Sequence, residues 1–191
     1  VSRGARALFV AEWYWLEQKQ RLWEEFPGDK TAVLVVPDPL KALQNFARVY
    51  LGKFTSLYKI GITGSNGKTT TKEITGSLLR RTGKTLINKG NFNSEIGLPL
   101  SVLRVRGHHQ YGVFEMGMNH EGEMDVLSDI IKPDAALITN IGTAHIGLLG
   151  SKDAIAREKK KICSHFDGRQ MVLLYENEPY YPFLSKGIRG K

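Results

Sequence analysis

The fold of this chain is decided by one stretch, Ile60-Gly61-Ile62-Thr63-Gly64-Ser65-Asn66-Gly67-Lys68-Thr69-Thr70-Thr71. An apolar run ends at Thr63, a glycine-containing loop follows, and a helical pattern begins at Lys68. Gly64 and Gly67 allow the loop backbone to turn sharply and to approach a ligand closely. The loop amides and the N-terminus of the following helix then point at one spot, which favours an anion. The stretch therefore predicts an ATP-binding loop between a strand and a helix.

The side chains and the spacing of this loop narrow the interpretation. Lys68 adds a positive charge that can reach terminal phosphates, and Thr69 adds a hydroxyl suited to Mg²⁺. The common pattern G-x-x-x-x-G-K-[ST] fails because Ile62 stands where its first glycine belongs, whereas the shorter Gly64-x-x-Gly67-Lys68-Thr69 fits. This spacing argues against a P-loop kinase or GTPase. A plain Gly/Ser/Asn turn that carries a lysine by chance is the alternative, but it explains neither the strand before the loop nor the helix after it.

Composition bounds the class of protein. The chain has 191 residues, enough for about one domain or one and a half, and its hydrophobic content of 41% is ordinary for a soluble globular protein. Apolar runs stay far shorter than a membrane span, so we expect no membrane partner. The N-terminus lacks the apolar core of a signal peptide, and the single cysteine, Cys163, cannot form an internal disulfide. These features fit a reducing compartment and predict a cytoplasmic location.

The charge of the chain points to anionic partners. A formal net charge of +8 suits nucleotides, phosphorylated sugars or nucleic acid. Apart from Arg80-Arg81 and Lys159-Lys160-Lys161, the basic residues are dispersed, and they form no stripe interleaved with aromatic residues. We therefore expect no nucleic-acid partner, and a basic nucleic-acid-binding module is kept only as an alternative.

Strands alternate with helices along the chain, which predicts an α/β fold with a mostly parallel sheet flanked by helices. The expected strands are 7–10, 32–36, 58–63, 85–87, 111–116, 135–139 and 171–175, and the expected helices are 40–51, 68–81, 97–105, 122–131 and 155–165. Residues 12–25 form a polar, Trp-rich stretch, a turn is expected at 26–29, and 52–56 is typical of a linker. We therefore expect part of a small N-terminal α/β domain at 1–53 and part of an ATP-binding central domain at 54–191.

Polar clusters follow three of the expected strands, after Thr63, Phe114 and Thr139. Parallel sheets bind ligands at the carboxyl ends of their strands, so these clusters are candidate site residues. Glu115 can hold Mg²⁺ directly or through water, although a surface acid near a turn has the same pattern. His145, beyond the third strand, can ligate a metal as a neutral imidazole, although a lone histidine here is more often structural or solvent-facing.

Two further segments carry candidate side chains. Asn91–Pro99 is a polar loop that opens a helix, and its asparagines can hydrogen-bond amides and sugar hydroxyls in both senses. The alternative for this loop is an Asn-rich turn with Ser94 as N-cap. Lys159 lies beside Lys160 and Lys161 on a predicted helix, where adjacent side chains point in different directions. At most one or two of these lysines can face a site, and a solvated basic face is the alternative.

Together these motifs resemble the Mur ligase family, which makes bacterial cell-wall precursors. The loop at 63–71 is similar to the ATP loop of that family, including its short glycine spacing. Segments 90–100, 115–123 and 140–151 most resemble the branch that joins D-Ala-D-Ala to UDP-MurNAc-tripeptide. The resemblance implies an ATP-dependent peptide ligase of peptidoglycan synthesis that uses Mg²⁺. It implies attack of the tripeptide carboxylate on the γ-phosphate, followed by displacement of phosphate by the D-Ala-D-Ala amine.

The resemblance also implies roles for individual residues. Lys68 would contact the β- and γ-phosphates and Thr69 a Mg²⁺, whereas Glu115 and His145 would ligate a second Mg²⁺. Lys159 matches a carbamylated lysine of the family, and a carbamate is an oxygen-rich anion that Mg²⁺ accepts. The implied catalytic residues are Lys68, Lys159 and His145. The implied nucleotide-binding residues are Gly64, Ser65, Asn66, Gly67, Lys68, Thr69, Thr70 and Asn140, and the implied substrate-binding residues are Asn91, Asn93 and Ser94.

The resemblance leaves a sister ligase of the MurE, folylpolyglutamate synthase or cyanophycin synthetase type as an alternative. It also implies that the chain is an internal piece of a three-domain enzyme. In the family, the ATP-binding domain continues beyond the position of Lys191, and a further domain then binds the amino substrate. We expect that this piece does not complete the ligation alone, and that the enzyme is a monomer.

Overall fold

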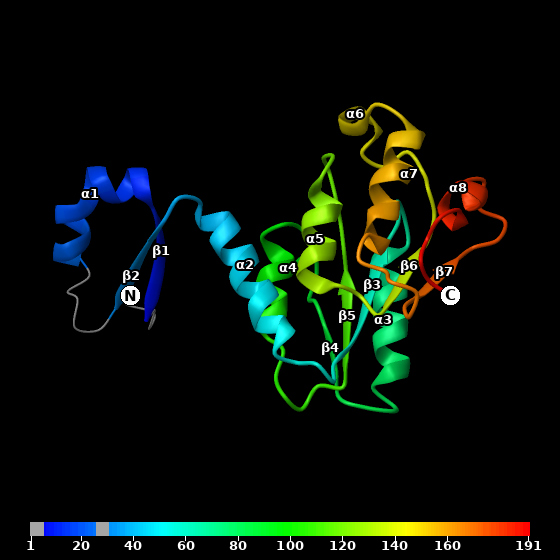
Figure 1. Cartoon of the computed structure of the whole chain (residues 1–191), viewed down its shortest axis with the longest axis horizontal. Helices are drawn as coiled ribbons and strands as arrows, with labels where there is room; N and C mark the ends of the chain where they lie inside the picture. The colour runs from blue at the N-terminus through cyan, green and yellow to red at the C-terminus, as the bar shows by residue number, and fades with distance from the viewer. Residues whose placement is uncertain (1–5, 26–30) are drawn as a thin grey trace. The chain divides into compact units, whose positions relative to one another are not determined.

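The computed structural model describes residues 6–25 and 31–191, so the turn predicted at 26–29 lies outside the described residues. The chain divides into two compact units, Val1–Phe46 and Ala47–Lys191. The division falls within helix α2 (Pro39–Gly52), drawn in cyan in Figure 1. Ala47 and Leu51, near the end of α2, belong to the hydrophobic core of the second unit. The domain limits 1–53 and 54–191 stay a prediction.

The first unit contains a parallel pair of strands, β1 (Ala7–Ala11) and β2 (Ala32–Val36), joined through helix α1 (Glu12–Glu25). Both strands were expected from their β-branched and apolar runs. The helix was not predicted, because its apolar positions do not form a clean stripe. Its Glu, Gln, Lys, Arg and Leu residues nevertheless all have high helix propensity, which accounts for its formation.

The second unit is built on a five-stranded sheet of order β4-β5-β3-β6-β7, and every pair in it is parallel. The strands are β3 (Tyr58–Thr63), β4 (Thr85–Ile87), β5 (Tyr111–Glu115), β6 (Ala135–Ile138) and β7 (Met171–Leu174). The helices are α3 (Lys68–Leu79), α4 (Gly97–Val102), α5 (Glu123–Ile131), α6 (Ile146–Leu149), α7 (Lys152–Lys160) and α8 (Tyr181–Ser185), with a 3₁₀ turn η1 (Lys161–Cys163) after α7. The predicted α/β fold with a mostly parallel sheet flanked by helices is confirmed.

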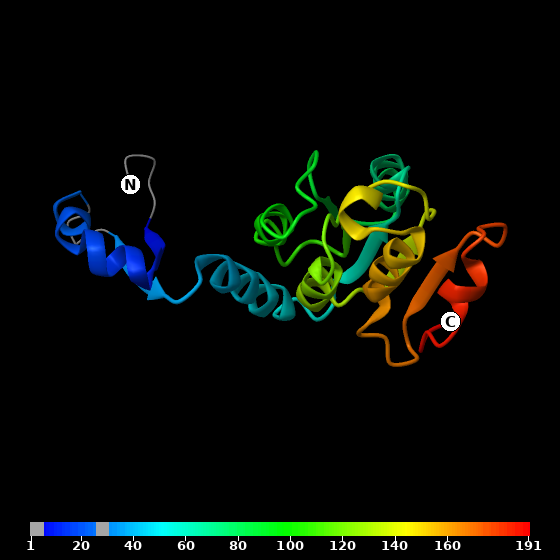
Figure 2. The same ribbon diagram turned by 90° about the horizontal axis from the view of Figure 1, so that it is seen from above.

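The topology of this sheet creates a crevice beside β3. From β3 the chain crosses to β4 through α3, whereas from β6 it crosses the other way to β7 through α7. Because such crossovers are right-handed, α3 and α5 lie on opposite faces of β3, as Figure 2 shows. The loops that follow β3 and β6 therefore leave in opposite directions, and a ligand binds between strands at such a switch point. The strand β5, which neighbours the central strand β3, is almost wholly buried, as a sheet covered on both faces requires.

Helix ends differ from the predicted ones by a few residues. The helix expected at 155–165 begins earlier, at Lys152, because the Ser151 hydroxyl accepts a hydrogen bond from the Ala154 amide at 3.1 Å and caps it. The helices expected at 68–81 and 97–105 end at Leu79 and Val102. Helices α6 and α8 span only 4 and 5 residues, too few to show a helical period in sequence. Within the described ranges, no helix has the length and apolarity needed to cross a bilayer.

Candidate functional site

The glycine loop takes the backbone shape that its sequence predicts. Gly64 has φ +147°, and a Cβ added there would lie 1.8 Å from the Thr139 hydroxyl oxygen, so the position accepts only glycine. Gly67 has φ +80° and stands at the N-cap of α3. Both glycines thus let β3 turn directly into the start of α3, with the first amides of the helix facing the loop.

The loop is fastened to the end of β6. Asn140 accepts hydrogen bonds from two loop amides, through its carbonyl from Ser65 N and through Oδ1 from Asn66 N, both at 3.0 Å. The Asn140 Nδ2 and the Thr139 hydroxyl donate to the Asn66 carbonyl at 3.2 and 2.6 Å. The Ser65 hydroxyl accepts from the Gly142 amide at 2.8 Å. Asn140 was predicted to bind nucleotide, and its side chain here shapes the loop that would do so.

Two lysines converge on one carbonyl of the loop. Lys68 Nζ and Lys159 Nζ donate to the Gly64 carbonyl oxygen at 2.8 and 2.9 Å. Lys68 also donates to the Ser65 carbonyl at 3.4 Å. Two ammonium groups on one oxygen form a concentrated positive charge, which favours an anion such as a phosphate group.

Lys159 is the more deeply buried of the pair, with 1% of its surface exposed. Burial, followed by the nearby charge of Lys68, lowers the pKa of Lys159 from 10.5 to about 7. Burial also lowers the pKa of Lys68, against the opposing effect of Glu115. A lysine with a pKa near neutrality carries a substantial fraction of free amine, which is the nucleophilic form.

Glu115, at the end of β5, joins the loop helix to the predicted substrate loop. Its Oε2 accepts a hydrogen bond from the Thr69 hydroxyl at 2.9 Å, and its Oε1 accepts one from Asn93 Nδ2 at 2.7 Å. Lys72 Nζ lies 3.5 Å from Oε2. The carboxylate is therefore not the surface acid of the alternative interpretation, since only 2% of the residue is exposed.

His145 lies near the same cationic centre. It follows β6 at the N-cap of α6 with φ +66°, a left-handed conformation. Burial lowers its pKa, and the charges of Lys159 and Lys68 lower it further, which favours the neutral form of the imidazole. A neutral imidazole keeps a free lone pair for a metal or for a proton.

The predicted substrate loop, Asn91–Pro99, makes few contacts with the other residues of the site. Asn93 contacts Glu115, whereas Asn91 and Ser94 are exposed. The Ser94 hydroxyl accepts a hydrogen bond from the Gly97 amide at 3.3 Å, but the N-cap of α4 is Ile96, so the alternative with Ser94 as N-cap is wrong. Thr70 is also exposed, in the first turn of α3. These side chains are free to meet a bound molecule.

Sequence reasoning missed two buried residues of this site, Lys72 and Asn88, each fully buried. Asn88 donates from Nδ2 to the Glu115 carbonyl at 3.0 Å and accepts from the Glu115 amide at 2.8 Å, so it extends the pairing of β4 with β5. The signal for Lys72 was its position four residues after Lys68, on the same face of α3. Asn88 gave a weaker signal, as a polar residue directly after a strand.

The side chains of this site supply some, but not all, of the oxygen ligands that magnesium ions require. Thr69 and Glu115 offer a hydroxyl and a carboxylate, the hard oxygen ligands that Mg²⁺ prefers. Within residues 6–25 and 31–191, no cluster of three His, Cys, Asp or Glu side chains is arranged to hold a metal. A second ion beside Glu115 and His145 would thus need oxygen atoms from elsewhere, and a carbamate on Lys159 would supply them.

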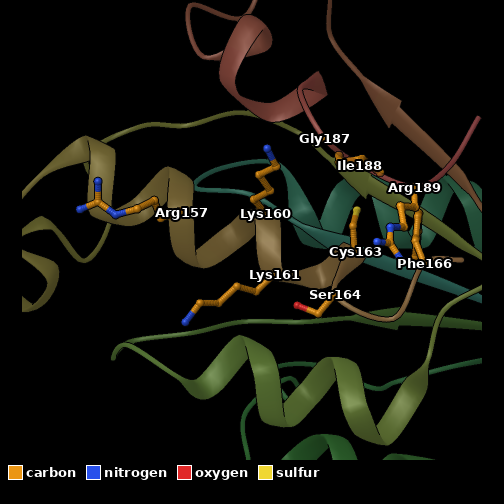
Figure 3. Close-up of a pocket in the computed structure, with 9 residues that line it drawn as sticks. All are labelled: Arg157, Lys160, Lys161, Cys163, Ser164, Phe166, Gly187, Ile188 and Arg189. Carbon is orange, nitrogen blue, oxygen red and sulfur yellow. The ribbon is translucent and has the colours of Figure 1, made fainter.

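A separate cavity lies beside another face of α7 (Figure 3). It has a volume of about 370 Å³ and is lined by Arg157, Lys160, Lys161, Cys163, Ser164, Phe166, Gly187, Ile188 and Arg189. Lys160 and Lys161 point in opposite directions there, as expected for adjacent helical residues. Lys160 donates to the carbonyls of Phe183 and Lys186, and Lys161 pairs with Asp125 and Glu158. These cations are already engaged, and burial raises the pKa of the Cys163 thiol to about 12, so we assign no ligand to this cavity.

A parallel sheet whose central strand runs through a short glycine loop into a helix places the second unit among the P-loop α/β domains. The model of the Mur ligase middle domain matches residues 62–191. The chain belongs to the Mur ligase family, as its motifs led us to expect.

Similar proteins include ligases whose printed names refer to D-alanyl-D-alanine or to MurF. The chain is 47% identical over 191 residues to the UDP-N-acetylmuramoyl-tripeptide–D-alanyl-D-alanine ligase of Treponema pallidum, covering all of this chain and 41% of that protein. A solved UDP-N-acetylmuramoylalanyl-D-glutamyl-2,6-diaminopimelate–D-alanyl-D-alanyl ligase from Acinetobacter baumannii superposes with a TM-score of 0.81 at 35% identity, over 96% of this chain and 44% of that one. MurF from Thermotoga maritima, solved with ADP, gives a TM-score of 0.77 at 28% identity, over 98% and 47%. The chain spans less than half the length of these relatives.

Proposed function

We propose that this chain is part of an ATP-dependent ligase that adds D-Ala-D-Ala to UDP-MurNAc-tripeptide during peptidoglycan precursor synthesis. The observation that carries the proposal is the cluster in which Lys68 and Lys159 share the Gly64 carbonyl. Glu115, which joins Thr69 of the loop helix to Asn93, lies within the electrostatic reach of Lys68. The relatives that bear the name of this ligase support the choice of substrates.

The loop would bind the phosphates of ATP. Its amides and the N-terminus of α3 converge at the crevice, and Lys68 supplies a mobile charge. The Lys68 ammonium donates hydrogen bonds to the carbonyls of Gly64 and Ser65. When ATP binds, a phosphate oxygen would replace one of these carbonyls as the acceptor. The Thermotoga maritima relative was solved in complex with ADP, which supports an adenine nucleotide as a ligand of this chain.

Thr69 and Glu115 would hold a magnesium ion that neutralises charge on the phosphates when bound. Glu115 stays in place before any ion arrives, because Thr69, Asn93 and Lys72 fix its two oxygens. Such a prearranged carboxylate needs little rearrangement to accept a cation.

Lys159 would be carbamylated. Its free amine, which the lowered pKa favours, would attack the carbon of CO₂ and lose a proton, which leaves an anionic carbamate. The product converts a buried cation into two oxygen ligands beside His145, whose imidazole is already neutral. The family resemblance and the lowered pKa of Lys159 both support this modification.

The reaction would proceed in two displacements. An oxygen of the tripeptide carboxylate attacks the γ-phosphorus of ATP, and ADP leaves. The amine of D-Ala-D-Ala then attacks the acyl carbon, phosphate leaves with its electron pair, and the nitrogen loses a proton. The residues of this chain would act mainly by holding the reactants together and by balancing negative charge, and Asn91, Asn93 and Ser94 would hold the UDP-linked peptide.

The experiment that tests the proposal follows the product. The full-length protein is incubated with ATP, Mg²⁺ and UDP-MurNAc-tripeptide, together with D-Ala-D-Ala or with a single amino acid, and the UDP-linked products are identified by mass spectrometry. We expect a product longer by D-Ala-D-Ala only. A product that gains one amino acid would instead identify a sister ligase of the family.

A further inference from the structure

Lys72 is a buried cation of the site whose contacts extend beyond Glu115. Lys72 lies on α3, and its side chain is 0% exposed. Its Nζ donates to the carbonyl of Asn88 at 2.9 Å and to that of Gly90 at 3.4 Å. The same nitrogen lies 3.5 Å from Glu115 Oε2 and 3.4 Å from Oε1 of Glu73, whose own side chain is half exposed.

Burying a lysine is unfavourable unless its charge is paired and its protons are accepted. Here the compensating groups belong to two different segments of the chain. Glu115 ends β5, whereas the carbonyls of Asn88 and Gly90 lie at the start of the segment that leads into the substrate loop. The ammonium group of Lys72 therefore fixes both the orientation of the Glu115 carboxylate and the backbone path of the segment that begins at Asn88.

Asn88 makes this link stiff. Its side chain is paired at both ends with the backbone of Glu115, and its Nδ2 donates at 2.8 Å to the carbonyl of Phe92 inside the substrate loop. Lys72 holds the carbonyl of the same Asn88. The loop that carries Asn91, Asn93 and Ser94 is thus anchored at its base by α3, the helix that begins at the phosphate loop.

We propose that Lys72 is a positioning residue that couples the phosphate-loop helix to the loop for the UDP-linked peptide. It contacts neither reactant in this scheme and acts by ordering residues 88–94. The role assigned to that loop rests on the proposed function, whereas the ordering of the loop by Lys72 does not.

The test uses Lys72→Met in the full-length protein, with Lys89→Met as the matched control, because Lys89 is an exposed lysine of the same segment. The double variant Lys72→Met/Glu115→Gln removes both buried charges and so avoids leaving Glu115 unpaired. Hydrogen exchange of the backbone amides is measured in segments 88–94 and 135–138, without substrates. The KM values for UDP-MurNAc-tripeptide and for ATP are then measured for the single variants.

For Lys72→Met and the double variant we expect exchange in 88–94 to become faster by about tenfold or more, as loss of a charged hydrogen bond allows, with 135–138 unchanged. We expect the KM for UDP-MurNAc-tripeptide to rise by about tenfold and the KM for ATP to change far less. Lys89→Met should match the wild type in all of these measurements.

Unchanged exchange in 88–94, equal acceleration in both segments, or failure of both Lys72 variants to fold would overturn the proposal. If the wild-type protein does not turn over UDP-MurNAc-tripeptide, the proposed function fails, and the exchange measurement still decides the role of Lys72.

Discussion

Gly64→Ala is expected to destabilise the second unit and to disable the phosphate loop. The new Cβ would lie 1.8 Å from the Thr139 hydroxyl oxygen, 3.0 Å from its Cβ and 3.1 Å from its backbone nitrogen. Rotation of the hydroxyl relieves the first clash but breaks its 2.6 Å hydrogen bond to the Asn66 carbonyl. The other two contacts then force the end of β6 to move away from the loop.

The expected loss of stability in Gly64→Ala is the sum of the backbone strain and the lost hydrogen bond. A side chain at φ +147° has a strain of about 1–3 kcal/mol, and the lost hydrogen bond adds about 1 kcal/mol. We therefore expect the free energy of unfolding to fall by about 2–4 kcal/mol. Nucleotide affinity should fall as well, because the displaced Gly64 carbonyl no longer sets the positions of Lys68 and Lys159.

Urea unfolding followed by circular dichroism measures the first effect, since the three tryptophans of the chain all belong to the first unit and would not report on the second. Titration with a fluorescent ATP analogue measures the expected loss of nucleotide affinity. Gly107→Ala is the control, because a Cβ there meets no atom within 4 Å. Equal stability of Gly64→Ala and Gly107→Ala, with equal nucleotide affinity, would refute the reasoning.

Three further predictions follow from the charges of the site. The unmodified folded protein releases the Lys159 proton near pH 7 and the unfolded chain near 10.5, so stability should rise with pH across that window in CO₂-free buffer, and Lys159→Met should reduce the rise in urea titrations, with the contribution of Lys68 remaining. Glu115→Ala should lower the free energy of unfolding by about 3–5 kcal/mol, because Lys72 loses its buried carboxylate partner and keeps only the half-exposed Glu73, whereas Glu115→Gln should lower it less. Removal of Mg²⁺ by EDTA should stop turnover of the full-length protein while leaving its melting temperature unchanged, because protein groups satisfy Glu115 without a metal; a large drop in melting temperature would contradict this.

The sequence was sufficient to predict the parallel sheet and the phosphate loop because their signals are local. Gly64 and Gly67 are required by backbone angles, and Lys68 and Thr69 follow them directly in the chain. The three polar clusters were predicted to follow the carboxyl ends of their strands, and the hydrogen bonds from the Asn66 amide to Asn140 and from Thr69 to Glu115 show that they lie together there.

The remaining features depend on contacts between distant segments. The burial of Lys72 could not be predicted, because a lysine on a helix is normally solvated and its partners Asn88 and Glu115 lie 16 and 43 residues away in sequence. The lowered pKa of Lys159 likewise comes from packing, since the next two residues in the sequence, Lys160 and Lys161, are lysines as well. Only the fold distinguishes the lysine that faces the loop from those that face the cavity.

The central claim is tested most directly by the release of phosphate from ATP by the full-length protein. Release is followed with UDP-MurNAc-tripeptide, in the presence and absence of D-Ala-D-Ala, for the wild type, Lys68→Ala and the exposed-lysine control Lys84→Ala. We predict sustained release that requires both substrates, is lost in Lys68→Ala and is unchanged in Lys84→Ala. Release that ignores D-Ala-D-Ala, or that survives in Lys68→Ala, would contradict the account.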